Sequence, residues 1–259
     1  MKKVLVTLAI VLFAATSANA MPFVLNPDGV LGTAYGPTGV FNQLGVYFQT
    51  TSNEVGGAFS DVGNVAVTSL IPSVNNAGLD QQWQFTGLWK DLVGTQSGGS
   101  FLYTAGTLDL YVSSTKNYNF GSSIGAEDDV NFDTGVKVAS LSLVERYGFL
   151  LPVPTPKQYI GTVDLTWEFT YLNSDFWLDQ YGNEIDLSKL SAGEKLFAFA
   201  DANTDLVELY PQLDGSLIVK SDHNGSVGIG VVPEPTSMVL FGTGLFGLAG
   251  AGLRKKILG

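Results

Sequence analysis

The 259-residue chain contains no cysteine and one histidine, and only 14% of its residues are charged. The lack of cysteine excludes disulfides, thiolate zinc sites, iron–sulfur clusters and cysteine nucleophiles, and a single histidine excludes a multi-histidine metal centre. Basic residues are also scarce, since 13 Lys and Arg stand against 24 Asp and Glu, a net charge of −11. Nucleic-acid-binding proteins need a basic face for phosphates, so the acidic charge argues against that class and no nucleic-acid partner is expected. Hydrophobic residues make up 45% of the chain, which is enough for a buried core.

The first twenty residues have the three parts of a secretory signal peptide. A basic pair at 2–3 precedes an apolar run over 4–15, and Ala18 and Ala20 form a small-x-small cleavage site. The apolar run is short for a membrane span of ~20 residues. The sequence therefore predicts cleavage after Ala20 and a mature chain that begins at Met21.

The C-terminus carries a second segment of three parts in order. These are Pro233-Glu234-Pro235, an uncharged stretch over 237–253, and Arg254-Lys255-Lys256. As a helix the uncharged stretch would span about 26 Å, close to the ~30 Å hydrocarbon core of a bilayer. The basic cluster favours a cytoplasmic end, and the two prolines keep the segment before the helix extended, as suits a protease substrate.

This tail, over residues 233–259, resembles the PEP-CTERM sorting signal. The resemblance implies recognition by an exosortase, a membrane-embedded transpeptidase-like protease, in a Gram-negative bacterium that makes exopolysaccharide. It implies export across the inner membrane, transient insertion of the C-terminal helix there, and release to the cell surface or extracellular matrix after C-terminal processing. A plain C-terminal membrane anchor is the alternative. The expected organisation is a signal peptide at 1–20, a folded body at 21–232 and the sorting signal at 233–259.

The body is strongly acidic and has the pattern of β-structure. It carries 8 basic and 23 acidic residues. Apolar residues alternate with polar ones over nine positions, at Val163, Leu165, Trp167, Phe169 and Tyr171, which predicts a strand with one buried face. Further strands are predicted over 62–70, 82–89, 101–104, 107–112, 136–144 and 195–200. Only 187–194 looks helical.

Turn signals separate these short strands. Asp214-Gly215 predicts a hairpin with a type I′ turn, and Asn224-Gly225 predicts a second hairpin. Pro211 predicts an edge or bulged strand. The proline-rich segment 152–156 is interpreted as a crossing loop within one domain. Many short strands with turns between them favour an all-β fold, an antiparallel β-sandwich of the jelly-roll type.

The body also resembles, weakly, secreted PEP-CTERM proteins associated with flocculation. The similarity lies in the order of four short stretches, 106–112, 138–141, Asp214-Gly215 and Asn224-Gly225-Ser226, before the Pro-Glu-Pro segment. The resemblance implies a role in aggregation within an exopolysaccharide matrix and transfers no catalytic residues.

Two acidic stretches are candidate calcium sites. Oxygen-bearing side chains recur in the first at Asp201, Asn203, Asp205 and Glu208, in a spacing that suits a hard cation. An EF-hand loop would need Gly where Leu206 stands and Glu where Gln212 stands, so the match is partial. The second stretch is Glu127-Asp128-Asp129 with Asp133. The alternative for both stretches is a solvated acidic turn.

Two aromatic side chains and the single histidine complete the candidates. Trp167 follows the apolar phase of its strand and is expected in the core. Trp177 lies between Asp175 and Asp179 and is expected to be exposed and to stack on a glycan. His223 precedes the Asn-Gly turn signal and is expected in an exposed turn.

These observations predict a non-enzymatic surface or matrix protein, sorted by an exosortase and acting in aggregation, biofilm or exopolysaccharide association. No cofactor is expected other than Ca²⁺. Two alternatives stay open: a secreted glycan hydrolase that uses a carboxylate pair, and a structural surface protein without a ligand.

Overall fold

The computed structural model describes residues 20–32, 35–97, 100–121, 126, 129–152, 159–191 and 194–233. The strands are β1 (Phe23–Leu25), β2 (Gln43–Val55), β3 (Ala58–Ile71), β4 (Gln84–Ser97), β5 (Ser100–Ala105), β6 (Thr107–Ser113), β7 (Val136–Pro152), β8 (Tyr159–Leu172), β9 (Trp177–Asp179), β10 (Glu194–Pro211) and β11 (Leu217–Pro233). Two short helices accompany them, the unpredicted α2 (Pro27–Leu31) and the 3-10 helix η1 (Leu187–Lys189), which is shorter than the predicted helix over 187–194. No helix among the described residues is long and apolar enough to cross a membrane.

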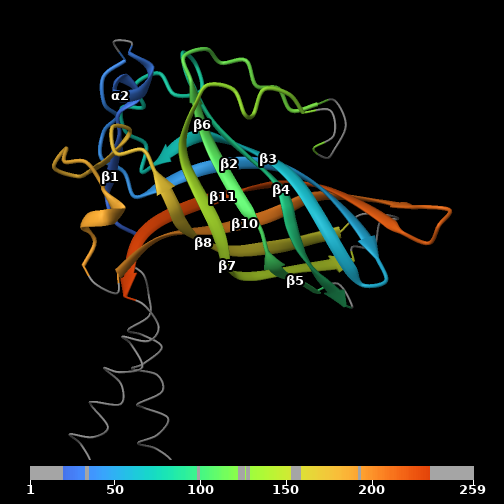
Figure 1. Cartoon of the computed structure of the whole chain (residues 1–259). Coiled ribbons are helices and arrows are strands. Elements are labelled where there is room, and N and C mark those ends of the chain that lie inside the picture. The colour runs from blue at the N-terminus through green and yellow to red at the C-terminus, as the bar shows by residue number, and fades with distance from the viewer. Residues whose placement is uncertain are drawn as a thin grey trace, which may run out of the picture.

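Nine antiparallel strands form one sheet in the order β3-β2-β11-β10-β8-β7-β5-β4-β6. The strand β3 also pairs with β4, which closes the sheet on itself, and β5 and β6 share the position between β4 and β7. The result is a barrel-like arrangement of eight positions (Figure 1). The predicted antiparallel all-β class is confirmed. The predicted jelly-roll sandwich is wrong, because pairing continues around the ring instead of separating into two facing sheets.

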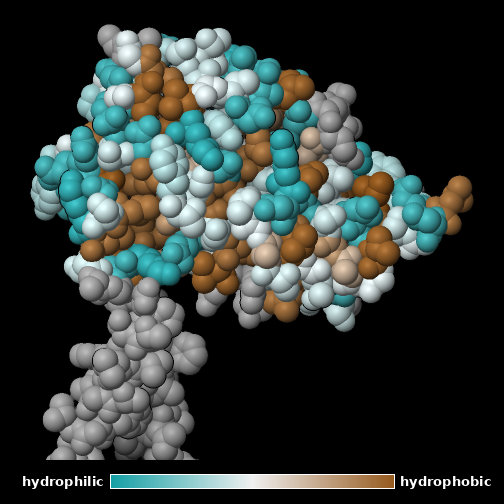
Figure 2. All heavy atoms as spheres, viewed as in Figure 1, coloured by the Kyte–Doolittle hydropathy of each residue, from teal (hydrophilic) through white to brown (hydrophobic). Residues whose placement is uncertain are grey.

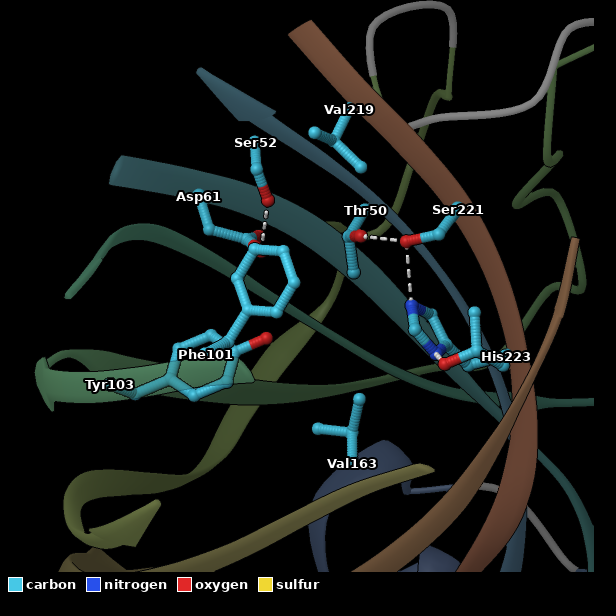
Figure 3. A pocket seen from close by; sticks show the side chains of 10 residues that line it. Thr50, Ser52, Asp61, Phe101, Tyr103, Val163, Val219, Ser221 and His223 are labelled. Carbon is cyan, nitrogen blue, oxygen red and sulfur yellow. Dashed lines mark hydrogen bonds between the residues drawn. The ribbon is translucent and has the colours of Figure 1, made fainter. Parts of the chain in front are cut away.

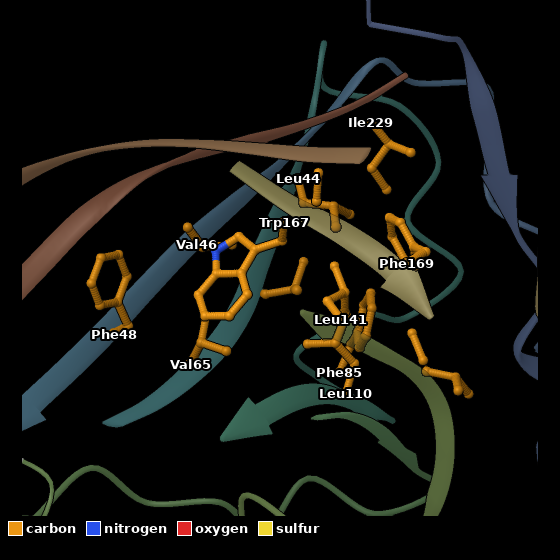
Figure 4. Packing of buried hydrophobic residues seen from close by; sticks show 14 of the residues in the cluster. Leu44, Val46, Phe48, Val65, Phe85, Leu110, Leu141, Trp167, Phe169 and Ile229 are labelled. Carbon is orange, nitrogen blue, oxygen red and sulfur yellow. The ribbon is translucent and has the colours of Figure 1, made fainter. Parts of the chain in front are cut away.

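The alternation in β8 determines which side chains enter the closed sheet. Val163, Leu165, Trp167 and Phe169 are all buried, with exposed fractions of 3 to 7%. Trp167 packs among side chains from β2, β3 and β7, as Figure 4 shows. The prediction that Trp167 is a core residue is therefore confirmed. Tyr171 departs from the pattern and is 43% exposed, at the end of the strand.

The two hairpin signals have different outcomes. Strands β10 and β11 are joined at Asp214-Gly215, where Gly215 has a left-handed φ of 87° and donates its N–H to the carbonyl of Gln212. Asn224 and Gly225 instead lie within β11, paired with both β10 and β2, so the second predicted turn is wrong. Pro211 lies on the part of β10 that pairs with β11 alone, and its predicted edge position is confirmed.

The two ends of the described chain lie at the same end of the closed sheet. The N–H of Met21 donates to the carbonyl of Ile229 at 2.6 Å, four residues before β11 ends at Pro233. The small sheet of β1 and β9 lies near this end, while the β10–β11 hairpin projects from the opposite end (Figure 1). At about 3.3 Å per residue, β11 extends over about 50 Å between the two ends.

A long connection, residues 114–135, joins β6 to β7, and we call it the strap. Its described residues, 114–121, 126 and 129–135, cover part of the outer surface of the sheet. Its Phe120 and Phe132 rings pack together with centroids 4.7 Å apart, and Phe132 is 2% exposed. The side chains of Gln84 and Thr86 on β4 form hydrogen bonds with strap residues, and one of these runs from Thr86 Oγ1 to the carbonyl of Phe132. The outer face of β2, β3 and β4 is therefore buried where the strap crosses it.

Candidate functional site

A cavity of about 20 Å³ lies inside the closed sheet and is lined by both polar and apolar side chains. Its walls come from β2, β3, β5, β8, β10 and β11, and Figure 3 shows how the side chains face one another. The lining residues are Thr50, Ser52, Asp61, Phe101, Tyr103, Val163, Thr204, Val219, Ser221 and His223. A cavity of this volume with several polar groups in its wall suits about one water molecule.

One wall of the cavity carries a buried carboxyl group, that of Asp61. Asp61 is 2% exposed and accepts hydrogen bonds from Ser52 Oγ at 2.8 Å and from Trp89 Nε1 at 2.9 Å. Burial raises the pKa of Asp61 from 3.8 to about 7, although both hydrogen bonds act to lower it. Gly63 makes the Trp89 contact possible, since a Cβ there would lie 2.2 Å from the indole ring.

The opposite wall carries a chain of hydroxyl and imidazole groups. His223 is 4% exposed and its ring stacks on Phe48, with centroids 4.4 Å apart. Its Nε2 lies 2.8 Å from Ser221 Oγ, which lies 2.6 Å from Thr50 Oγ1, and its Nδ1 lies 3.1 Å from Thr204 Oγ1. Burial lowers the pKa of His223 from 6.5 to about 3, so the ring is neutral at ordinary pH. The prediction of an exposed turn is wrong, because the strand β11 continues through this position.

The contact between Ser221 and His223 resembles a nucleophile and its general base in distance alone. The Nδ1 atom of the imidazole faces the Thr204 hydroxyl, where a hydrolase would place a carboxylate. A base with a pKa near 3 accepts a proton poorly, and about 20 Å³ leaves no room for a scissile bond. The arrangement suits a buried structural network better than catalysis.

Trp177 does not lie at the surface, so its predicted role in glycan stacking is wrong. The side chain is 1% exposed and its Nε1 donates to the carbonyl of Val138 at 3.0 Å. The rings of Phe23, Phe85, Phe169 and Phe176 surround it at centroid distances of 5.4 to 5.8 Å. Asp179, two residues further on, accepts hydrogen bonds from the backbone N–H groups of Tyr181 and Asn183 in the turn that follows β9.

The first predicted calcium stretch forms a strand instead of a loop. Asp201 and Asn203 are exposed on β10, and Asp201 pairs with Asp164 on β8, while Glu208 pairs with Lys220 on β11. Seven residues of extended strand place Asp201 and Glu208 about 23 Å apart, so the set cannot surround one ion. The side chain of Asp205 is not among those that the structure describes.

The second acidic stretch belongs to the strap. Asp129 Oδ1 accepts from the N–H of Gly121 at 2.7 Å, and its Oδ2 accepts from Asn64 Nδ2 at 3.1 Å. Asp133 is exposed, and Glu127 and Asp128 lie outside the described residues. Among the described residues, no three or more His, Asp or Glu side chains converge as metal ligands.

Sequence reasoning did not find Asp61 among the candidates, and it placed His223 wrongly. A polar residue at an inward position of a strand is a usable signal, but the strand predicted over 62–70 began one residue after Asp61. The terminal signals are not described by the structure: Ala18, Glu234, Pro235, Arg254, Lys255 and Lys256 lie outside it. Ala20 and Pro233 are the first and last residues that it does describe.

The last strand of the folded body, β11, ends at Pro233, the first residue of the Pro-Glu-Pro segment. The family model of the PEP-CTERM protein-sorting motif matches residues 231–256, and the chain is a PEP-CTERM domain-containing protein. The motif indicates an exported protein that is sorted by an exosortase and is membrane-associated at the cell surface. No curated protein and no solved structure matches the chain.

Proposed function

We propose that the body is a non-enzymatic surface protein that acts in aggregation, biofilm or exopolysaccharide association, and that it contacts matrix glycan through the end of the sheet farthest from its sorting tail. The supporting observation is the position of the chain ends. The sorting motif begins at residue 231, within the last three residues of β11. The N–H of Met21 donates to the carbonyl of Ile229 in the same strand. The β2–β3 and β10–β11 hairpins, which we call the distal hairpins, therefore project away from the site of processing (Figure 1).

The distal hairpins expose side chains that suit a sugar surface. Leu213 at the tip of the β10–β11 hairpin is fully exposed, and Val55 at the tip of the β2–β3 hairpin is 62% exposed. Apolar atoms mark the tip of the first hairpin in Figure 2. Tyr210 is 43% exposed, donates to the Glu208 carboxylate, and has Lys220 Nζ 5.4 Å from its ring centroid. An aromatic ring flanked by charged hydrogen-bonding groups is a typical sugar contact.

The alternative of a glycan hydrolase has little support from the cavity. Glycosidases act with two carboxyl groups on either side of the scissile bond. Asp61 is the one carboxyl group among the ten side chains that line the cavity. This lining therefore lacks the second carboxyl group that a glycosidase needs.

The proposal is tested by deletion of the gene and complementation with variants, scored by cell aggregation and by retention of the protein in the matrix. Tyr210→Ala should weaken the pull-down of surface-released protein with matrix polysaccharide. Tyr181→Ala is the matched control, since Tyr181 is 81% exposed in the turn that follows β9. Normal aggregation in the deletion strain would contradict the role. Absence of any polysaccharide binding by the wild type would instead favour a structural surface protein without a ligand.

A further inference from the structure

The outer face of β2 is buried beneath the strap, and this is where polar groups collect. The Phe120 ring meets the Tyr47 ring edge-on, with centroids 4.6 Å apart. The N–H of Ala126 donates to Thr51 Oγ1 at 3.0 Å, and Asn64 Nδ2 donates to the Asp129 carboxylate. The contact therefore involves β2, β3 and the strap, and it is more polar than the aromatic cluster beside it.

Strand register places three polar side chains in one row on this face. Gln49 of β2 pairs with Asp222 of β11 on one side and with Asn64 of β3 on the other. Directly paired residues of neighbouring strands have Cβ atoms about 5 Å apart. Asp129 of the strap joins the Asn64 end of the row through its hydrogen bond. The Gln49 side chain therefore lies between two acids, Asp222 and Asp129, that are far apart in sequence.

The Gln49 amide has an oxygen without a partner at this position. Gln49 is 4% exposed, and its Nε2 donates to Tyr47 OH at 3.3 Å. Its Oε1 is buried and accepts no hydrogen bond from the described residues, a loss that is costly for a buried acceptor. Burial raises the pKa of Tyr47, the hydrogen bond with Gln49 lowers it, and the carboxylates of Asp222 and Asp129 raise it further.

We infer that Gln49, Asp222 and Asp129 form a binding site for a hard divalent cation of the Ca²⁺ type. An amide oxygen and two carboxylates are the ligands that Ca²⁺ takes in proteins, and its flexible shell of 6–8 oxygens admits water at the remaining positions. A cation would supply the partner that Gln49 Oε1 lacks and would offset the charge of the two acids. Lys220 stands in the next row, opposite Thr51, and its ammonium is directed over the Tyr210 ring.

Such a site would tie the strap to the sheet. Gln49 and Asp222 belong to paired strands of the closed sheet, whereas Asp129 belongs to the connection that crosses them. A cation held by all three would therefore stabilise the folded state, because a ligand that binds only the native protein raises its stability by mass action.

The test measures thermal unfolding of the surface-released protein in about 1 mM CaCl₂, a concentration that suits extracellular calcium sites, against NaCl of equal ionic strength. We expect the wild type to melt at a higher temperature in Ca²⁺, and Asp222→Asn and Gln49→Leu to lose this increase. Calorimetric titration with CaCl₂ should show affinity at least tenfold weaker in both variants. Gln49→Leu should remain folded without Ca²⁺, since it removes an unpartnered polar group.

The matched control is Asp201→Asn, which removes an exposed acid from β10 on the same outer surface. It should keep the full response to Ca²⁺. The inference is overturned if Ca²⁺ leaves the wild-type melting temperature unchanged, if Gln49→Leu binds Ca²⁺ as tightly as the wild type, or if Asp201→Asn loses the response equally.

Discussion

The buried carboxyl group of Asp61 should make the protein lose stability as the pH rises. Its pKa is about 7 in the folded protein and 3.8 in its ordinary state, a difference that corresponds to about 4 kcal/mol. At a pH between these two pKa values, the Asp61 carboxyl group is protonated in the folded protein and ionised in the unfolded chain. Stability therefore falls as the pH rises from about 4 to about 7, and the full loss is present above pH 7.

The substitution Asp61→Asn removes this titration and keeps the geometry. The amide oxygen can accept from Trp89 Nε1, and the amide nitrogen can donate to Ser52 Oγ, so both hydrogen bonds are preserved. We expect wild type and variant to have similar stability at pH 4. At pH 8 the variant should be more stable than the wild type by up to about 4 kcal/mol.

Urea unfolding at several pH values from 4 to 8 measures the free energy of unfolding of the wild type and of Asp61→Asn. His223 has the opposite effect on stability. Its pKa is lowered from 6.5 to about 3, so the stability that its neutral ring contributes is lost as the pH falls through that range. It contributes equally to both proteins and cancels in their difference. The control Asp133→Asn, at an exposed position, should parallel the wild type. The reasoning is refuted if the curves of the wild type and Asp61→Asn are parallel from pH 4 to 8.

Two further predictions concern the core and the chain ends. Trp177→Ala and Trp167→Ala should each destabilise the protein by about 3–5 kcal/mol, because each empties a large buried aromatic site. Thermal or urea unfolding measures this loss. A loss below about 1 kcal/mol for Trp177→Ala would show that its ring is not in the core. Mass spectrometry of surface-released protein should find an N-terminus at Met21 and no peptide that contains residues 254–256, because both ends carry removal signals. Detection of the basic C-terminal peptide in that fraction would argue against exosortase processing.

Local patterns were sufficient to predict most strands, because alternation is set by neighbouring residues. The run around Trp167 has one buried and one exposed face, and β8 follows it closely. The strand β2 was not predicted, although it is 13 residues long. Its outer face is covered by the strap, so residues such as Gln49 are buried on the side where alternation requires exposure. A strand that is buried on both faces has no period of two to detect.

Local sequence patterns could not predict that the strands form a closed sheet. The same alternation fits a sandwich and a closed sheet, and the choice depends on whether β3 pairs with β4. The hairpin at Asp214-Gly215 was correctly predicted, but the type I′ turn was wrong, because Gly215 has a left-handed φ and Asp214 does not. The Asn224-Gly225 pair has the same composition, yet pairing on both sides extends the strand through it.

The sequence by itself determined the acidic charge, the all-β class and the C-terminal sorting motif, because each is a property of composition or of contiguous residues. Only the tertiary structure decided which polar residues are buried together. Asp61 and His223 face one cavity from β3 and β11, and Gln49 meets Asp222 across the β2–β11 pairing. These contacts join residues more than a hundred positions apart, and strand register, which no local pattern encodes, is what brings them together.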